Sequence, residues 1–585
     1  MSGSVSGWLT RRRLLTTAGV LLFLLVVTFA WQAVRAGMAL GDVRSTAQRI
    51  TVDLNDGDLD AVDADVATLR RQTHRAAGET DGPLWSIGAH LPFVGHSIDA
   101  VRTTGQVLDR IADRSLPALI GLAHSVADGD LRPRHGRVDI AAVRAHAPAV
   151  RRAAAAVDPL ADQLADIRTH GLVYPLDRLL PDLQTRVAEA KSAIDATADA
   201  FDVLPTMLGA DGPRRYLLIV QNPAELRSTG GLPGSLAVLT ANHGRVTMGE
   251  QGDAGLFGTG PVPVKPTKTE KALYGADLGK DFRDLTFNPD FSRVAQMAAG
   301  IARAAGQRVD GVFAVDPIAL SYVLAGTGPV DIGNGASLTS ANAAQFLLNT
   351  VYQSVPDASA QNDFYALAAR KTFNALVSGQ GDQVRAIRGL VLAAGQHRVL
   401  AWSAHPNVAA VIGRNRLSGA LPGDTGSIPQ VGIYYNDGVA GKIDFYLRQR
   451  TTARSLGCTD GVQRIQVTTT LRSTVPKDHR SLSWFITGTG AYAPKGDIVA
   501  QMSLYSPWQG HIEKISVDGH DATTTSGRQF GQEVGSVAVH LRPGASMTVT
   551  STMTTGKGQT GNIKVTSTPG MELTPDPATF TTTCG

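Results

Sequence analysis

The sequence predicts an α+β multidomain fold: an N-terminal transmembrane helix, a helical stalk or bundle, an α/β sandwich domain and a C-terminal β-sandwich. Three observations predict it: a long apolar run near the N-terminus, alternating strand and helix patterns in the middle, and an apolar period of two from Cys458 onward. The expected segments are a cytoplasmic tail (1–13), a transmembrane helix (14–34), a helical region (40–205), an α/β domain (214–450) and a β-sandwich (456–585).

The composition of the 585 residues is that of a globular protein, with 43% hydrophobic and 18% charged residues. The net charge of +4 is small for this length, and aromatic residues make up only 6%. A weak, scattered positive charge and few stacking side chains argue against a nucleic-acid partner. We therefore expect no nucleic acid among the partners.

The apolar run at residues 14–34 defines the expected cellular location. At 1.5 Å per residue, a helix of this length measures about 31 Å, which matches the hydrocarbon core of a bilayer. Arg11, Arg12 and Arg13 precede it, which predicts a cytoplasmic N-terminus. A cleaved signal is the alternative, but a signal h-region is shorter and no A-x-A site follows. The sequence thus predicts a single-pass cell-membrane protein with most of the chain extracytoplasmic and the lipid bilayer as a partner.

The only two cysteines are Cys458 and Cys584. A zinc site needs clustered cysteine and histidine ligands, which the sequence lacks. Two cysteines in an exported chain favour a bridge, so we expect a disulfide between them.

The local patterns predict individual elements in both halves of the body. In the α/β region they predict strands, a hairpin turn and two helices, at Tyr216–Val220, Ser235–Thr240, Asn242–Gly244, Arg245–Met248, Phe291–Ala305, Val312–Val315 and Pro317–Leu324. In the C-terminal region they predict strands at Ile465–Leu471, Ser483–Ile486, Ile498–Tyr505, Val537–Leu541, Met547–Met553 and Ile563–Thr568.

The densest polar constellation follows the first of these strands. It includes amides, a carboxylate, a guanidinium and two glycines, at Gln221, Asn222, Glu225, Arg227, Gly230 and Gly231. Loops at the carboxyl ends of strands in α/β sheets commonly bind ligands, and arginine offers a fork for phosphate or carboxylate. The other interpretation is that Glu225 pairs locally with Arg227 while the glycines only form a turn.

Asp316 and Arg370 are further candidates for ligand binding. Asp316 precedes Pro317, so it either caps the following helix or holds a ligand or metal. Arg370 lies on an expected helix, where a solvated face is the alternative to a ligand contact. The sequence has no G-x-S-x-G elbow, no Walker loop and no H-E-x-x-H motif, so the catalytic residues stay unassigned.

Several of these motifs resemble domain-of-unknown-function family 4012, a group of actinobacterial membrane-anchored proteins. The resemblance lies in the segment Arg215–Asn222 and in the residues Glu225, Leu226, Arg227, Gly230 and Gly231. Asp310–Val312, Asp316-Pro317 and Thr327–Val330 fit the same pattern. The resemblance implies a membrane location and says little about activity.

The order of strand, arginine-containing loop and hairpin is also similar to the LytR-CpsA-Psr family. That family transfers glycopolymers from polyprenyl-diphosphate carriers, with arginines and a magnesium-binding aspartate on the diphosphate. Arg227 matches the first such arginine, but Thr229 replaces the expected acid, and Gly249–Asp253 replaces a later arginine-aspartate element. Arg370 could stand in for the arginines missing near Asn349–Tyr352.

Two functional hypotheses follow. The first is a non-catalytic cell-envelope protein that binds or scaffolds glycopolymer assembly and uses no cofactor. The alternative is a divergent phosphotransferase acting on a polyprenyl-diphosphate-linked glycopolymer. In that case Arg227 and Arg370 would clamp phosphates, and Asp253 or Asp316 would hold magnesium. The implied ligands are a cell-wall glycopolymer or a polyprenyl phosphate.

Overall fold

The computed structural model describes residues 41–53, 58–134, 136–258, 263–276, 278–333, 335–572 and 578–584, together with Gln32, Arg35 and Met38. The chain divides into two compact units. The first comprises residues up to 131 and residues 141–204, and the second comprises residues 132–140 and 205–585.

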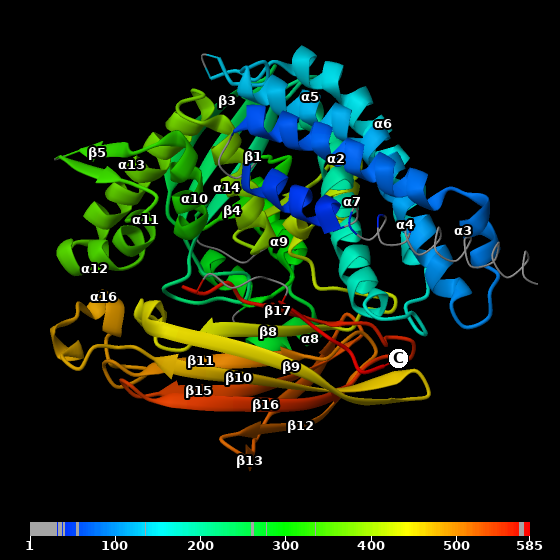
Figure 1. Ribbon diagram of the computed structural model, residues 1–585. Helices are drawn as coiled ribbons and strands as arrows, with labels where there is room; N and C mark the ends of the chain where they lie inside the picture. Colours follow the sequence, from blue (N-terminus) through cyan, green and yellow to red (C-terminus); the bar gives the residue numbers. More distant parts are fainter. Residues whose placement is uncertain are drawn as a thin grey trace, which may run out of the picture. The chain divides into compact units, whose positions relative to one another are not determined.

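The first unit is helical. After a helical segment at 41–53 it contains α2 (Leu59–Thr80), α3 (Pro83–Gly88), α4 (Gly95–Arg114), α5 (Leu116–Ala127), α6 (Ile140–Ala165) and most of α7 (Leu176–Met207) (Figure 1). Asp58 caps α2 by accepting a hydrogen bond from the amide of Ala61. Val107 of α4 and Leu164 of α6 are fully buried in one apolar cluster between helices. Charged residues occupy the remaining faces, so these helices are amphipathic.

No helix in the described part of the chain has the length and apolar character needed to cross a bilayer. This finding corrects the predicted fold class, which included a transmembrane helix. The predicted span at 14–34 lies outside the described residues except for Gln32. The long helices that are described contain charges along their length, as α6 does at Arg144, Arg151 and Asp158. The described fold is therefore a mixed α and β structure without a spanning helix.

The second unit begins with a five-stranded mixed sheet in the order β3-β2-β1-β4-β7. Its strands are β1 (Arg214–Asn222), β2 (Leu232–Asn242), β3 (Arg245–Gly252), β4 (Gly311–Val315) and β7 (Val399–Ser403). β1 and β4 are parallel, and the other pairs are antiparallel. Successive residues of β1 face opposite layers: Leu217 and Ile219 pack with α9, whereas Tyr216 and Leu218 share a cluster with Phe373 of α13.

Helices and short elements connect the strands of this sheet and follow β7. They are α8 (Lys268–Tyr274), η1 (Phe282–Phe287), α9 (Phe291–Ala304), α10 (Pro317–Thr327), β5 (Val330–Gly333), β6 (Ala336–Leu338), α11 (Ala343–Gln345), η2 (Phe346–Thr350), α12 (Val351–Ser354), α13 (Ala358–Val377), α14 (Gln383–Gly395), α15 (Pro406–Gly413) and η3 (Arg416–Ser418). The helices predicted near residues 291 and 317 are confirmed as α9 and α10. They begin at these residues because Asp290 and Asp316 cap their first turns.

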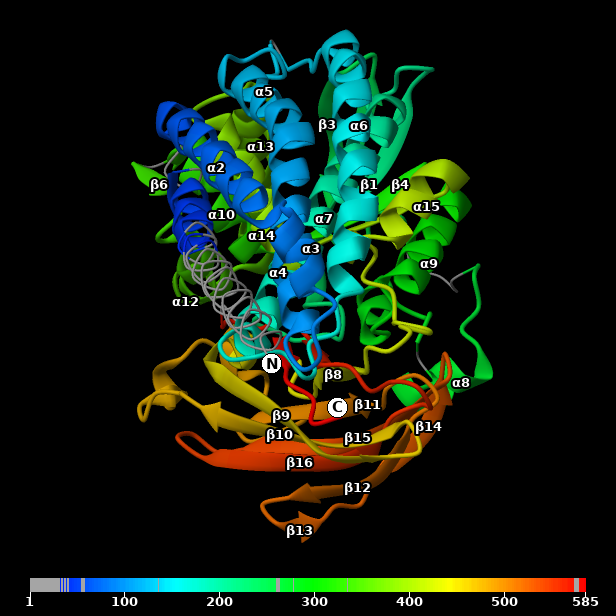
Figure 2. The ribbon, with the colours of Figure 1, turned by 45° about the vertical axis from the view of Figure 1, so that its right-hand side comes forward.

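The rest of the second unit is a sandwich of two sheets (Figure 2). One sheet contains β13 (His520–Asp521), β12 (His511–Val517), β16 (Ser546–Thr554), β10 (Val462–Ser473) and β9 (Leu447–Thr459) in that order. The other contains β14 (Thr525–Gln529), β15 (Gln532–Leu541), β11 (Ile498–Tyr505), β8 (Gln430–Asp437), β17 (Ile563–Ser567) and β18 (Ala578–Phe580). Between β8 and β11 lie η4 (Ile443–Tyr446), η5 (His479–Ser481) and α16 (Trp484–Thr487).

The alternation in β10 is visible in its burial. Ile465, Val467 and Leu471 are buried in the core between the sheets, and they include residues with no exposed surface. Cys584 forms the expected disulfide with Cys458 of β9, across 126 residues of sequence.

One predicted strand is wrong. Ser483–Ile486 forms the start of the single-turn helix α16, because the Ser483 hydroxyl caps the turn by accepting a hydrogen bond from the amide of Phe485.

Candidate functional site

The loop that follows β1 was the strongest candidate from sequence, and the structure places it against the β-sandwich. Asn222 ends β1, and its side-chain oxygen accepts a hydrogen bond from the amide of Ala224 at 3.0 Å, which turns the chain. The amide of Leu232, at the start of β2, donates to the carbonyl of Glu225 at 3.0 Å and closes the loop. All of the residues from Gln221 to Gly231 are buried.

Sandwich residues satisfy the backbone of this loop. The amide of Leu226 donates to Asp444 Oδ2 at 2.9 Å, and the amide of Ser228 donates to Asn436 Oδ1 at 2.9 Å. Thr568 Oγ1 donates to the carbonyl of Ser228 at 3.0 Å. These three backbone groups of the loop are therefore paired within the chain and not available to a ligand.

Arg227 is buried, with 6% of its surface exposed. Its Nη2 donates to Glu225 Oε1 at 2.9 Å, its Nη1 lies 3.9 Å from Asp437 Oδ2, and its guanidinium stacks over the ring of Phe287 at 4.4 Å. The glycines serve the loop itself, since a Cβ on Gly231 would lie 2.3 Å from the carbonyl oxygen of Asn222. The geometry therefore agrees with the interpretation in which Glu225 pairs with Arg227 and the glycines form a turn.

Five ionisable side chains meet at this place, and we call them the buried ion cluster: Glu225, Arg227, Asp437, Lys442 and Asp444. Lys442 Nζ forms a short ion pair with Glu225 Oε2. Three carboxyl groups thus face two cations in a mostly buried space, so the cluster would have a net charge of −1 if every group were ionised. A buried excess charge is costly, which favours protonation of one carboxyl group.

The pKa shifts follow from this imbalance. Burial and the charge of Glu225 raise the pKa of Asp437 from 3.8 to about 7. Burial and the neighbouring Asp437 raise the pKa of Asp444 well above its usual range. Burial alone would raise the pKa of Glu225, but Lys442 and Arg227 lower it below its ordinary value. The two cations therefore favour the ionised form of Glu225, whereas burial and Asp437 favour the protonated form of Asp444.

The other candidate residues lie in separate contacts. Asp316 Oδ1 caps α10 at Ala319 N, 2.7 Å away, and its Oδ2 accepts from Arg398 Nη1 at 2.7 Å in a buried pair. Arg398 Nη2 also donates to the carbonyls of Gly570 and Glu572. Asp316 and Arg398 thus form a second link between the mixed sheet and the C-terminal part of the sandwich.

Arg370 is exposed on α13 and donates twice to Gln251 Oε1, at 2.9 and 2.6 Å. Asp253 Oδ1 accepts from the amide of Gly255 and holds a turn. Within the part of the chain that the structure describes, no ion pair or hydrogen bond joins Arg370, Asp253 or Asp316 to Arg227. No group of three or more potential metal ligands occurs among the described residues. The structure does not bring the candidates for a diphosphate site together.

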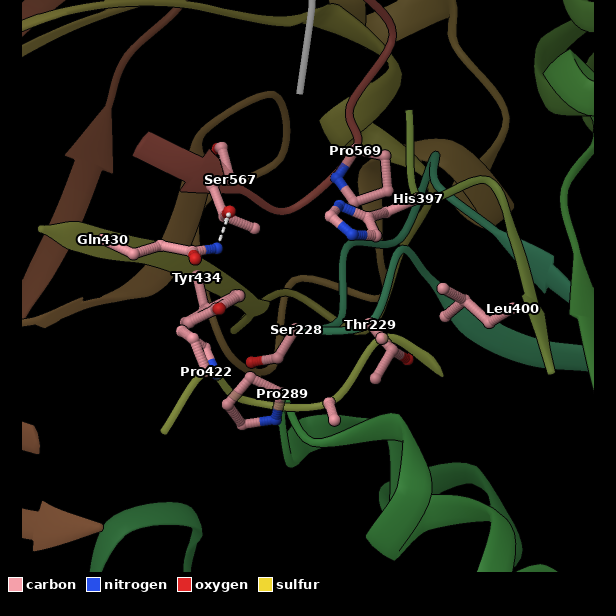
Figure 3. Close-up of a pocket in the computed structure, with 13 residues that line it drawn as sticks. Ser228, Thr229, Pro289, His397, Leu400, Pro422, Gln430, Tyr434, Ser567 and Pro569 are labelled. Atoms are coloured by element: carbon pink, nitrogen blue, oxygen red, sulfur yellow. Dashed lines mark hydrogen bonds between the residues drawn. The ribbon is translucent and has the colours of Figure 1, made fainter. Parts of the chain in front are cut away.

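A crevice of about 50 Å³ opens beside the loop, and its lining includes Ser228, Thr229, Tyr434 and Pro569 (Figure 3). At about 10–15 Å³ for each water molecule, a crevice of this size holds a few waters.

Sequence reasoning did not identify Asp437, Lys442, Asp444 or Arg398. Asp437 ends the apolar strand Gln430–Asp437, and Lys442 and Asp444 follow it, so a polar cluster at a strand end was the available signal. Nothing in the local sequence linked them to a loop more than 200 residues earlier.

By its geometry, this part of the chain is an α/β domain in which the β-sandwich packs at the carboxyl end of the central strand β1. Residues 211–352, from the start of β1 to α12, match DUF4012, a family of proteins of unknown function. The predicted resemblance to this family is confirmed over that segment. No curated protein matches the chain.

Proposed function

We propose that this protein is an exported, non-catalytic binding or scaffolding factor of the cell envelope, in which the loop at 221–231 joins the mixed sheet to the β-sandwich. One observation carries the proposal. Arg227, the residue best placed by sequence to grip a phosphate, is buried and paired with Glu225 inside the chain. The ion pairs of Arg227 help to hold the loop, and with it the mixed sheet, against the β-sandwich. A scaffolding protein needs its domains to keep such a fixed arrangement.

The covalent bridge supports an exported location. Disulfides persist in oxidising compartments and are rare in the cytosol, and Cys458 is bonded to Cys584. The role in glycopolymer assembly rests on the similarity of the motif order to the LytR-CpsA-Psr family.

The contacts of the candidate residues argue against the phosphotransferase alternative. A diphosphate would have to displace Glu225 from Arg227 and leave that carboxylate buried beside two further acids. Removing one partner of a buried pair costs about 3–5 kcal/mol, which a diphosphate contact would first have to offset. Arg370 is engaged with Gln251, and Asp316 is engaged with Arg398.

The two functions can be separated with the purified full chain, magnesium and a labelled polyprenyl-diphosphate glycan. We expect retention of the glycan on the protein without release of the lipid phosphate. The variant Arg370→Ala is the control for catalysis, because Arg370 is exposed and its loss leaves the buried contacts intact. Magnesium-dependent turnover that disappears in Arg370→Ala would establish the enzyme and refute the scaffold.

A further inference from the structure

Four arginines gather at the opposite end of the mixed sheet from the loop at 221–231. They are Arg132, Arg134, Arg137 and Arg245, all exposed, and we call them the arginine row. β1 has nine residues, so at about 3.3 Å per residue the two ends of the sheet are roughly 26 Å apart. The arginine row is therefore a place distinct from the buried ion cluster.

The β2–β3 hairpin and the segment 132–140 build the row together. His243 and Gly244 both have positive φ angles, +46° and +81°, as a tight two-residue hairpin turn requires. The amide of Val138 donates to the carbonyl of Gly244 at 2.9 Å. A Cβ on Gly244 would lie 2.1 Å from the carbonyl oxygen of Val138, so this close approach needs glycine.

Backbone pairing sets three of the arginines side by side. Arg134 and Arg137 exchange both backbone hydrogen bonds, at 2.8 and 3.0 Å, and face each other. Arg137 in turn faces Arg245 across an antiparallel bridge. The hydrogen bonds of that bridge come from the neighbouring residues, so Arg137 and Arg245 form a non-hydrogen-bonded pair, in which Cα atoms are about 4.5 Å apart and side chains lie closest. The arrangement is a row of three adjacent guanidinium side chains.

Arg132 lies at one end of the row, where its Nε donates to the carbonyl of Gly379 at 2.6 Å. This contact fixes the segment near the end of α13 without neutralising the charge.

Among the residues that the structure describes, none of the four arginines forms an ion pair, although Asp139 and Asp211 lie in the adjoining segments. Like charges directly opposite each other across strands destabilise a sheet. A neutral or acidic residue at any of these positions would remove this repulsion. Stability of the fold therefore does not explain why three arginines lie side by side, whereas binding of an external anion does.

The chemistry of these side chains limits which class of anion the row can bind. Guanidinium groups bind phosphate oxygens through two parallel hydrogen bonds, and a row of them matches several phosphates in succession better than one. Residues 132–140 and 243–246 contain no Phe, Tyr or Trp on which bases could stack. We propose that the arginine row binds a ligand that presents several phosphate groups in sequence, without reading nucleic-acid bases.

Binding of end-labelled inorganic polyphosphate to the purified full chain, followed by fluorescence anisotropy across a range of salt concentrations, tests the proposal. The triple variant R134Q/R137Q/R245Q should bind about tenfold or more weakly, and its salt dependence should be smaller by about two units of slope. The control R70Q/R186Q/R283Q removes three exposed arginines that are each paired with an aspartate. It should bind within about twofold of the wild type, because these arginines already have partners.

Two further measurements sharpen the result. R134K/R137K/R245K keeps the charge but lacks the planar fork, so it should fall between the wild type and the glutamine variant. Vesicles with and without an anionic phospholipid distinguish a lipid headgroup from a soluble phosphate chain as the source, and loss of either interaction in the glutamine variant supports the site. Equal losses in the two glutamine variants, unchanged binding in R134Q/R137Q/R245Q, no polyphosphate or vesicle binding, or equally tight binding of a DNA duplex would each overturn it.

Discussion

The two ends of the mixed sheet use arginine in opposite ways. At one end Arg227 is buried and its charge is answered by Glu225 and Asp437. At the other end Arg137 and Arg245 face each other in solvent, and within the described ranges neither forms an ion pair. The ion pairs of Arg227 contribute to the stability of the fold, whereas we propose that the guanidinium groups of the arginine row bind a ligand.

This difference teaches that motif density is a poor guide to a binding site. The loop at 221–231 concentrates polar residues within eleven positions and becomes part of the interior. The arginine row is assembled from two segments about 100 residues apart, and neither segment stands out locally. The two regions differ in whether acidic residues of the chain pack against the arginine side chains. Arg227 has such partners, and the arginine row has no ion pair among the described residues.

The largest effect should come from breaking the buried ion cluster at Arg227. Arg227→Ala removes one of the two cations that pair with Glu225 and leaves three buried acids beside Lys442. We expect a loss of about 3–5 kcal/mol in the free energy of unfolding, measured by urea denaturation. Arg70→Ala is the matched control, because Arg70 forms an exposed pair with Asp113 and should cost less than about 1 kcal/mol. Equal effects of the two substitutions would mean that Arg227 contributes nothing specific to the joint.

A smaller but similar loss is expected at the second link between the mixed sheet and the sandwich. Asp316→Asn keeps an oxygen that can cap α10 but leaves Arg398 without its counter-charge. We expect a loss of about 2–3 kcal/mol, and a double-mutant cycle with Arg398→Met should show coupling between the two positions. Strict additivity in that cycle would contradict the proposed link.

Most of the secondary structure on both sides of this comparison could be predicted from the sequence. β1, β2, the hairpin at Asn242–Gly244 and the helices near 291 and 317 all follow from local apolar patterns, capping residues and turn chemistry. The strand predicted at Ser483–Ile486 was wrong because a serine cap outweighed a short apolar run. Local rules succeeded where the deciding interactions lie within a few residues.

The candidate site was harder to predict, since its meaning depends on distant residues. Glu225 and Arg227 were correctly singled out, but Asp437, Lys442 and Asp444 come from a part of the chain more than 200 residues later. The pairing of Arg137 with Arg245 likewise requires the fold. A single sequence contains no local trace of either contact.

The raised pKa of Asp437 predicts how the stability of the buried ion cluster depends on pH. Its pKa is raised from 3.8 to about 7, so the folded chain binds a proton that the unfolded chain has released between these values. The stabilising contribution is complete below pH 3.8 and is lost as the pH rises toward 7. Asp437→Asn should flatten this part of the profile of unfolding free energy against pH. An unchanged slope in the variant would assign the pH dependence to other groups.

The smallest effect should have the opposite sign and lies in the arginine row. Arg137→Gln removes the central member, which faces Arg134 on one side and Arg245 on the other. Relief of like-charge repulsion across strands should raise the free energy of unfolding by on the order of 0.5 kcal/mol at low salt, and the gain should shrink as salt is added. The same variant should bind polyphosphate more weakly. A residue whose loss strengthens the fold while weakening binding is maintained for its ligand, whereas a loss of stability in Arg137→Gln would show that the row supports the fold as Arg227 does.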